Sequence, residues 1–207
     1  MSHPLGVRVA SGTDELIVWL LRHGETEWTE HDLHTGRRDV PLSDRGREQA
    51  RRAGRLIAAR RFDHVLVSPQ TRALQTCELA GLGANRRTCA ELVEWDYGEY
   101  QGLTDEQTDE RQPGWELFRD GAPGGESPEE ITVRTDRLLE TVSALDGTVA
   151  LVGHGKVLRA LGARFIGCSV SLGSLLPMFP AAISILEKQS SGPILRLWNL
   201  TAELAAA

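Results

Sequence analysis

Two histidines in this 207-residue chain follow apolar segments, in positions where an imidazole could do chemistry. Residues 17–21 are apolar and lead into Arg22-His23, and residues 148–152 lead into Gly153-His154. A neutral imidazole can attack phosphorus, and a guanidinium offers a planar fork of donors for phosphoryl oxygens. Alone, each histidine would more often be a packed or capping residue. Together they predict phosphoryl chemistry, provided that the fold brings them to one place.

A third strand end offers another cation. The apolar segment 65–67 ends at Ser68, and proline is favoured at the first helical position, so we expect a helix from Pro69 that carries Arg72. Free backbone N–H groups and the helix dipole at such an N-terminus favour an anion. Glu94, further along the chain, adds a carboxylate that could donate or accept a proton.

The elements that must position these residues alternate between short strands and longer helices. Strands alternating with helices predict an α/β fold with parallel strand pairs, covered on both faces. Ligands of such sheets bind outside the carboxyl ends of the strands, so His23, Arg72 and His154 should share one crevice. We expect strands at 17–21, 65–67, 88–93, 148–152, 182–187 and 194–199, and helices at 43–60, from 69, at 127–144 and after residue 155.

Charge limits the classes of partner. The net charge is −6 and the pI is near 5.6, so the chain as a whole repels nucleic acid and anionic membrane surfaces. We therefore expect no nucleic-acid partner and no membrane partner, and no apolar run is long enough to span a bilayer. A small phosphorylated substrate would need a local cluster of positive charge. The histidines lack metal-ligand spacing, and we expect neither a metal nor another cofactor. A homo-oligomer remains open.

One domain accounts for most of the chain. We expect a flexible leader at 1–15, a single domain at 16–200 and a tail at 201–207. Within the domain, residues 101–125 should form a lid or pocket wall anchored by Trp115 and Phe118. Three cysteines without metal or redox spacing, and a leader unlike a signal peptide, favour a cytoplasmic protein.

The motifs at the strand ends resemble those of the histidine phosphatase superfamily, which includes the cofactor-dependent phosphoglycerate mutases. The resemblance implies a three-layer α/β/α fold of the phosphoglycerate mutase type, with a mostly parallel central sheet. The pattern is most similar to the sedoheptulose-bisphosphatase-type and broad phosphatases of that family. The matching segments are Leu21 to Thr26, Thr35-Gly36, Pro41 to Ser43, Ser68 to Thr76, Glu94 to Gly98, Gly124 to Ser127 and Gly153 to Gly155.

The same resemblance implies a role for each residue. His23 would be the nucleophile that forms a phosphohistidine, and Glu94 the general acid and then the base. Arg22, Arg72 and His154 would surround the phosphoryl oxygens, and His154 would add charge when a phosphate dianion favours its protonation. The residues implied to bind the phosphate or the substrate are Arg22, Gly24, Glu25, Thr35, Gly36, Ser68, Arg72, Trp95, Tyr97, His154 and Gly155.

Three functions remain open at this point. The compact chain and the residues that follow Thr26 favour hydrolysis over transfer, because a mutase must hold a second phosphate. The favoured function is a metal-independent phosphatase that hydrolyses phosphomonoesters of small metabolites, with sugar phosphates as one candidate class. The alternatives are a phosphoglycerate mutase-type phosphoryl transferase, and a protein phosphatase or regulatory binding module.

Overall fold

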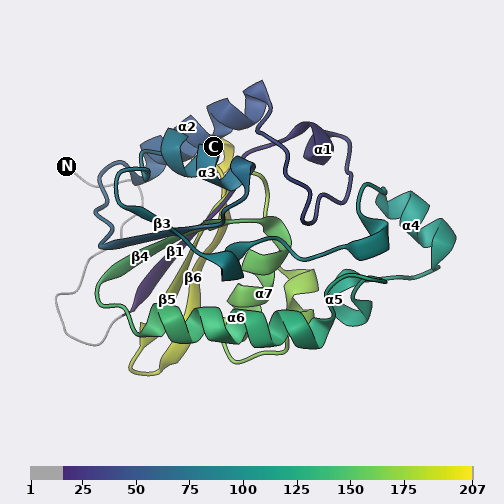
Figure 1. Cartoon of the computed structure of the whole chain (residues 1–207). Coiled ribbons are helices and arrows are strands. Elements are labelled where there is room, and N and C mark those ends of the chain that lie inside the picture. The colour runs from purple at the N-terminus through teal and green to yellow at the C-terminus, as the bar shows by residue number, and fades with distance from the viewer. Residues whose placement is uncertain (1–15, 207) are drawn as a thin grey trace.

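A computed structural model describes residues 16–206 of the chain, and the expected flexible leader lies outside this range. The described chain builds one six-stranded sheet in the order β3-β2-β4-β1-β5-β6 (Figure 1). The strands are β1 (Ile17–Arg22), β2 (His64–Val67), β3 (Arg86–Thr88), β4 (Thr148–Gly153), β5 (Ile183–Gln189) and β6 (Gly192–Leu200).

Four neighbouring strands run parallel, and the last two form an antiparallel hairpin. β4 pairs in parallel with β1 and β2, and β2 pairs in parallel with β3. β5 runs antiparallel to β1 and β6, with Ser190 and Ser191 between the two hairpin strands. The carboxyl ends of β1, β2 and β4 therefore meet at one edge of the sheet.

Helices cover both faces of this sheet, so the predicted three-layer α/β fold is confirmed. In Figure 1, α2 and α3 lie on one face, and α6 and α7 lie on the other. Alternate residues of β1 supply the two cores, because neighbouring side chains of a strand point to opposite faces. Val18 and Leu20 belong to the core under α6 and α7, and Trp19 and Leu21 to the core under α2 and α3.

The helices are of very different lengths, and the longest are those that cover the sheet. The α-helices are α1 (Glu27–Glu30), α2 (Asp44–Ile57), α3 (Thr71–Leu79), α4 (Asp105–Arg111), α5 (Leu117–Asp120), α6 (Pro128–Ser143), α7 (Gly155–Phe165) and α8 (Ala202–Ala205). Three 3₁₀ turns are η1 (Ala90–Leu92), η2 (Gly98–Tyr100) and η3 (Val170–Leu175). No helix within residues 16–206 is both long and apolar enough to pass through a membrane.

The strand expected at 88–93 is wrong. The third strand of the chain is β3 at Arg86–Thr88, and the chain then turns into η1. Among the described strands, β3 pairs only with β2, and all three of its side chains are exposed, so this edge carries arginines instead of an apolar pattern. Leu92, which lies within the expected strand, is fully buried from the 3₁₀ turn instead.

The helix expected from Pro69 begins two residues later, with Gln70 as its N-cap. The carboxylate of Asp39 accepts hydrogen bonds from the Thr71 backbone N–H at 2.7 Å and from the Thr71 hydroxyl at 2.6 Å. The anion expected at this helix N-terminus is therefore part of the chain itself. At the start of α6, Ser127 and Glu130 form a capping box: the Ser127 hydroxyl accepts from the Glu130 N–H, and the Glu130 carboxylate accepts from the Ser127 N–H.

Candidate active site

The carboxyl ends of three parallel strands bring the predicted residues together. The backbone N–H of His23 donates to the Gly153 carbonyl at 2.9 Å, and that of Ser68 donates to the Val152 carbonyl at 2.9 Å. This pairing places the imidazoles of His23 and His154 side by side, with ring centroids 5.1 Å apart. The crevice expected from the order of strands and helices therefore contains both histidines.

His23 is held as a neutral imidazole with a defined tautomer. Its Nδ1 lies 2.6 Å from the Gly24 carbonyl oxygen, which can only accept, so Nδ1 carries the proton and Nε2 keeps a free lone pair. Burial first, and then the charges of Arg72 and Arg22, hold the pKa of His23 well below its ordinary value of 6.5. An unprotonated Nε2 at neutral pH is the form that can attack phosphorus.

His154 is fully buried and anchored at one nitrogen. Its Nε2 lies 2.7 Å from the Ser68 hydroxyl, while its Nδ1 has no hydrogen-bond partner in the described chain. Burial, followed by the charge of Arg72, lowers the pKa of His154 well below 6.5. The ring is therefore neutral in the free protein, and a bound phosphate dianion would favour its protonation.

Two arginines, Arg22 and Arg72, flank the histidines, and each has one buried nitrogen without a hydrogen-bond partner in the described chain. Arg72 is fully buried and donates from Nη1 to the Arg38 carbonyl at 2.8 Å and from Nη2 to the Gly36 carbonyl at 3.0 Å. Arg22 donates from Nη1 to the Met178 carbonyl. The Nε atoms of both arginines are buried without a partner among residues 16–206. Burial lowers the pKa of Arg72 to about 10, so this guanidinium is still charged at neutral pH.

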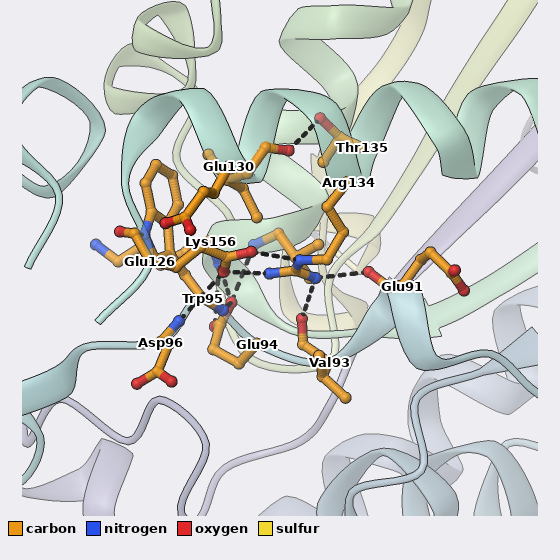
Figure 2. Close-up of polar contacts among 12 residues, drawn as sticks. Glu91, Val93, Glu94, Trp95, Asp96, Glu126, Glu130, Arg134, Thr135 and Lys156 are labelled. Carbon is orange, nitrogen blue, oxygen red and sulfur yellow. Dashed lines mark hydrogen bonds and ion pairs between the residues drawn. The ribbon is translucent and has the colours of Figure 1, made fainter. Parts of the chain in front are cut away.

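Glu94 approaches the same crevice from the loop after η1. Its carboxylate accepts from the backbone N–H groups of Trp95 at 3.0 Å and Lys156 at 3.1 Å (Figure 2). It also accepts from the backbone N–H of Val157 at 2.9 Å. The last two donors belong to the first turn of α7, whose N-cap is His154. The start of this helix therefore fixes the carboxylate and the second histidine relative to each other.

Arg134 of α6 holds the backbone of that loop. Its Nη1 donates to the carbonyls of Glu91 at 2.6 Å and Val93 at 2.8 Å, as Figure 2 shows. The residue next to Val93 is Glu94, so the guanidinium holds the backbone that carries the carboxylate. Neither carbonyl contact could be predicted from the sequence, because the residues lie about 40 positions apart.

The crevice forms a cavity of about 200 Å³. Eight of the residues that line it were predicted as site residues, among them Glu94 as the acid and base. The predicted residues that line it are Arg22, His23, Thr35, Gly36, Arg72, Glu94, Tyr97 and Gly155. Those that sequence reasoning missed are Thr29, Asp32, Leu33, His34, Asp105, Lys156, Arg159 and Met178. Lys156 directly follows His154-Gly155 in the sequence, and this position beside a predicted site residue could have identified it as a lining residue.

Five predicted site residues do not line the cavity. Ser68 and His154 are fully buried, and the Ser68 hydroxyl contacts His154 Nε2. The Gly24 carbonyl accepts a hydrogen bond from His23 Nδ1. The Glu25 carboxylate lies 3.4 Å from Arg45 Nη1 and accepts a hydrogen bond from the Ser43 hydroxyl at 3.3 Å, and both partners are at the start of α2. Trp95 is fully buried against Phe118 and donates to the Glu126 carbonyl, so its side chain has no path to a substrate.

A larger cavity of about 500 Å³ lies elsewhere, beside α6. Its lining includes arginines and glutamates of α6 and the preceding turn, but no histidine, so it lacks a nucleophile. Across residues 16–206, no three His, Cys, Asp or Glu side chains are grouped in a way that could hold a metal ion. The smaller cavity is therefore the candidate active site.

Comparison with known proteins agrees with this geometry. Residues 18–201 match the family model described as Histidine phosphatase superfamily (branch 1). An acid phosphatase of Mycobacterium tuberculosis is 42% identical over 172 residues, covering 80% of this chain and 83% of the relative. A 2,3-bisphosphoglycerate-dependent phosphoglycerate mutase of Azorhizobium caulinodans is 38% identical over 167 residues, covering 72% and 80%. The native structure of a mycobacterial glucosyl-3-phosphoglycerate phosphatase matches with a TM-score of 0.79 at 28% identity, covering 89% of this chain and 99% of that one.

Proposed function

The chain belongs to the histidine phosphatase superfamily and is a phosphoric monoester hydrolase, and we propose that it hydrolyses phosphomonoesters of small metabolites through a phosphohistidine at His23. We propose further that the reaction needs no metal ion. Sugar phosphates are one candidate substrate class.

One observation carries the proposal. Three buried nitrogen atoms around His23 lack a hydrogen-bond partner in the described structure, namely Arg22 Nε, Arg72 Nε and His154 Nδ1. Buried donors are rarely left unsatisfied, because each costs the free energy of its lost hydration. A bound phosphoryl group would supply an oxygen to each of them. The same donors would then stabilise the charge that spreads over these oxygens in the transition state.

In the first step, Nε2 of His23 attacks phosphorus and the ester P–O bond breaks. The leaving oxygen takes a proton from the carboxylic acid of Glu94, and the phosphoryl group remains on Nε2. In the second step, the Glu94 carboxylate takes a proton from water, the water oxygen attacks phosphorus, and the N–P bond breaks. Inorganic phosphate leaves, and both His23 and Glu94 return to their starting forms.

The size of the cavity favours a small substrate. Its volume of about 200 Å³ is below the range of about 300–1,000 Å³ that is usual for ligand pockets. A compact phosphorylated metabolite suits this space better than a folded phosphoprotein. The relatives named for an acid phosphatase and a glucosyl-3-phosphoglycerate phosphatase support hydrolysis.

The second candidate is phosphoryl transfer between positions of a phosphoglycerate, which the mutase relative at 38% identity favours. The two functions are separated by mixing the protein with 3-phosphoglycerate and 2,3-bisphosphoglycerate. A mutase releases 2-phosphoglycerate, whereas a phosphatase releases inorganic phosphate.

The proposed function is tested with p-nitrophenyl phosphate and a panel of sugar phosphates, in the presence of EDTA. Wild-type protein should release phosphate, and His23→Ala should lower the rate by at least about 1,000-fold, because the nucleophile is lost. His31→Ala is the matched control, since His31 is an exposed histidine. Equal rates for wild type and His23→Ala, or loss of activity in EDTA, would contradict the proposal.

A further inference from the structure

Two cations on the first turns of α7 line the active-site cavity in addition to the residues that the mechanism uses. Lys156 and Arg159 stand three residues apart, which places them on the same side of the helix. Both lie over the ring of Phe118, with Lys156 Nζ 5.8 Å and the Arg159 guanidinium carbon 4.7 Å from its centroid. The fold therefore holds two positive charges next to each other at the cavity wall.

Neither cation forms an ion pair with a carboxylate in the part of the chain that the structure describes. Arg159 donates to the carbonyls of Gly173 at 2.7 Å and Ser174 at 2.9 Å, which are neutral acceptors. In that part of the chain, the Lys156 backbone N–H donates to the Glu94 carboxylate. The ammonium itself is left without an acceptor in the same range.

The nearby carboxylates compensate this ammonium only in part, because Glu94 and Asp105 raise its pKa less than burial and Arg159 lower it. The Glu94 carboxylate already accepts hydrogen bonds from backbone N–H groups. Asp105 has a side chain that is 92% exposed, so water screens its charge, and it lies 3.5 Å from His34. Burial, followed by the charge of Arg159, lowers the pKa of Lys156 to about 8. Lys156 and Arg159 are two positive charges that are partly removed from water and not paired with an anion. Their repulsion and lost hydration raise the free energy of the ligand-free protein, and an anion bound between them would offset this cost.

We propose that Lys156, beside Arg159, forms a second anion subsite of the active site, so that preferred substrates are compact phosphomonoesters with a second anionic group, either a carboxylate or a further phosphate. The inference rests on the proposed function, because that function places the ester phosphate on Arg22, Arg72 and His154. The small cavity requires the two anionic groups to be only a few bonds apart. Lys156 is then a specificity-determining residue.

The subsite is tested by equilibrium binding in the His23→Ala background, where no probe can be turned over through the nucleophile. Three probes share a three-carbon frame: glycerol 3-phosphate has a neutral tail, 3-phosphoglycerate has a carboxylate and glycerol 1,3-bisphosphate has a second phosphate. At pH 7, at least one anionic probe should bind about 10- to 100-fold more tightly than glycerol 3-phosphate, the range of a charge-assisted hydrogen bond.

Three variants isolate the ammonium. Lys156→Met keeps the length of the side chain and its contact with Phe118, and should abolish the preference for the anionic probe. Lys156→Arg keeps the charge and should retain most of the preference. Lys188→Met removes the only other lysine, an exposed residue of β5, and should leave the preference as it was.

The outcomes separate the inference from the proposed function. Tighter binding of 3-phosphoglycerate alone identifies the second group as a carboxylate, and tighter binding of the bisphosphate alone identifies it as a phosphate. Equal binding of all three probes, no binding of any, or a preference that survives Lys156→Met would overturn the subsite. Failure of the wild type to hydrolyse any phosphomonoester would instead contradict the proposed function, and the binding ratio would still decide the subsite.

Discussion

Arg134 and Glu126 form a two-fold hydrogen-bonded ion pair, with Nε 2.7 Å from Oε1 and Nη2 2.6 Å from Oε2. Their side chains are only 8% and 10% exposed. Because the same guanidinium also holds the Glu91 and Val93 carbonyls, the pair connects the turn before α6 to the loop that carries Glu94. The position of the proposed acid and base therefore depends on a contact behind the active site.

Arg134→Met should lower both stability and turnover. Breaking a buried ion pair by removing one partner costs about 3–5 kcal/mol, because the other charge is left buried. The loss of the carbonyl contacts should also free Glu94 and reduce kcat more than it raises KM. Urea denaturation and steady-state kinetics measure the two effects. Arg51→Met, which breaks an exposed pair with Glu48, is the control and should behave as the wild type. A stable Arg134→Met protein with normal kcat would contradict this role.

His34 should make the protein less stable in acid. It is buried against Tyr97, with ring centroids 4.6 Å apart, and burial lowers its pKa from 6.5 to about 4. The unfolded chain binds this proton below pH 6.5 and the folded chain does so only near pH 4, so stability is lost as the pH falls through this window. His23 and His154 act in the same direction.

The free energy of unfolding should fall by up to about 1.4 kcal/mol per pH unit for each such histidine. Denaturant titrations between pH 7 and 4 measure this slope, and His34→Gln should make it shallower. A slope that is the same in wild type and His34→Gln would show that the ring titrates normally.

Gly24→Ala should disturb the nucleophile through packing. A Cβ atom at this position would lie 2.2 Å from the Gly46 carbonyl oxygen of α2, and that backbone has little room to move. We expect a loss of about 1–3 kcal/mol in stability and a lower kcat, because the Gly24 carbonyl sets the tautomer of His23. Gly153→Ala is the control in the same crevice, since its Cβ would meet Leu158 at an ordinary 3.5 Å. The interpretation fails if the two variants are equally active.

Ser68→Ala should lower kcat without removing any group that touches the phosphate. The change leaves Nε2 of the buried His154 ring without its partner, so the ring loses its fixed orientation. We expect about a tenfold fall in kcat, comparable to the loss of one hydrogen bond, and a smaller change in KM. Ser68→Thr keeps a hydroxyl and should restore part of the rate. Equal kcat values for Ser68→Ala and wild type would show that the contact does not orient the ring.

Five of the six strands, and the convergence of His23, Arg72 and His154, could be predicted from sequence because they follow local rules. An apolar segment that stops at a polar residue marks the end of a buried strand, and parallel strands end at the same edge. The family resemblance was equally local, and the family match over residues 18–201 confirms it.

The remaining features depend on contacts between distant segments. Asp39 caps α3 from 32 residues away, so the sequence around Thr71 gave no sign that its N-terminus was occupied. Trp95 was expected to bind substrate, but its ring packs on Phe118, which only the tertiary fold brings near. The unpaired ammonium of Lys156 is likewise a property of the folded cavity wall, and no local pattern predicts it.

Direct detection of the intermediate tests the central claim. Wild-type protein is mixed with phosphate-labelled p-nitrophenyl phosphate, quenched within milliseconds in alkaline denaturant, which preserves phosphohistidine, and mapped by mass spectrometry. We predict one acid-labile phosphoryl group on His23, formed at a rate at least equal to kcat and absent from His23→Ala. Turnover by the wild type without label on His23, or label on another residue that persists in His23→Ala, would contradict the account.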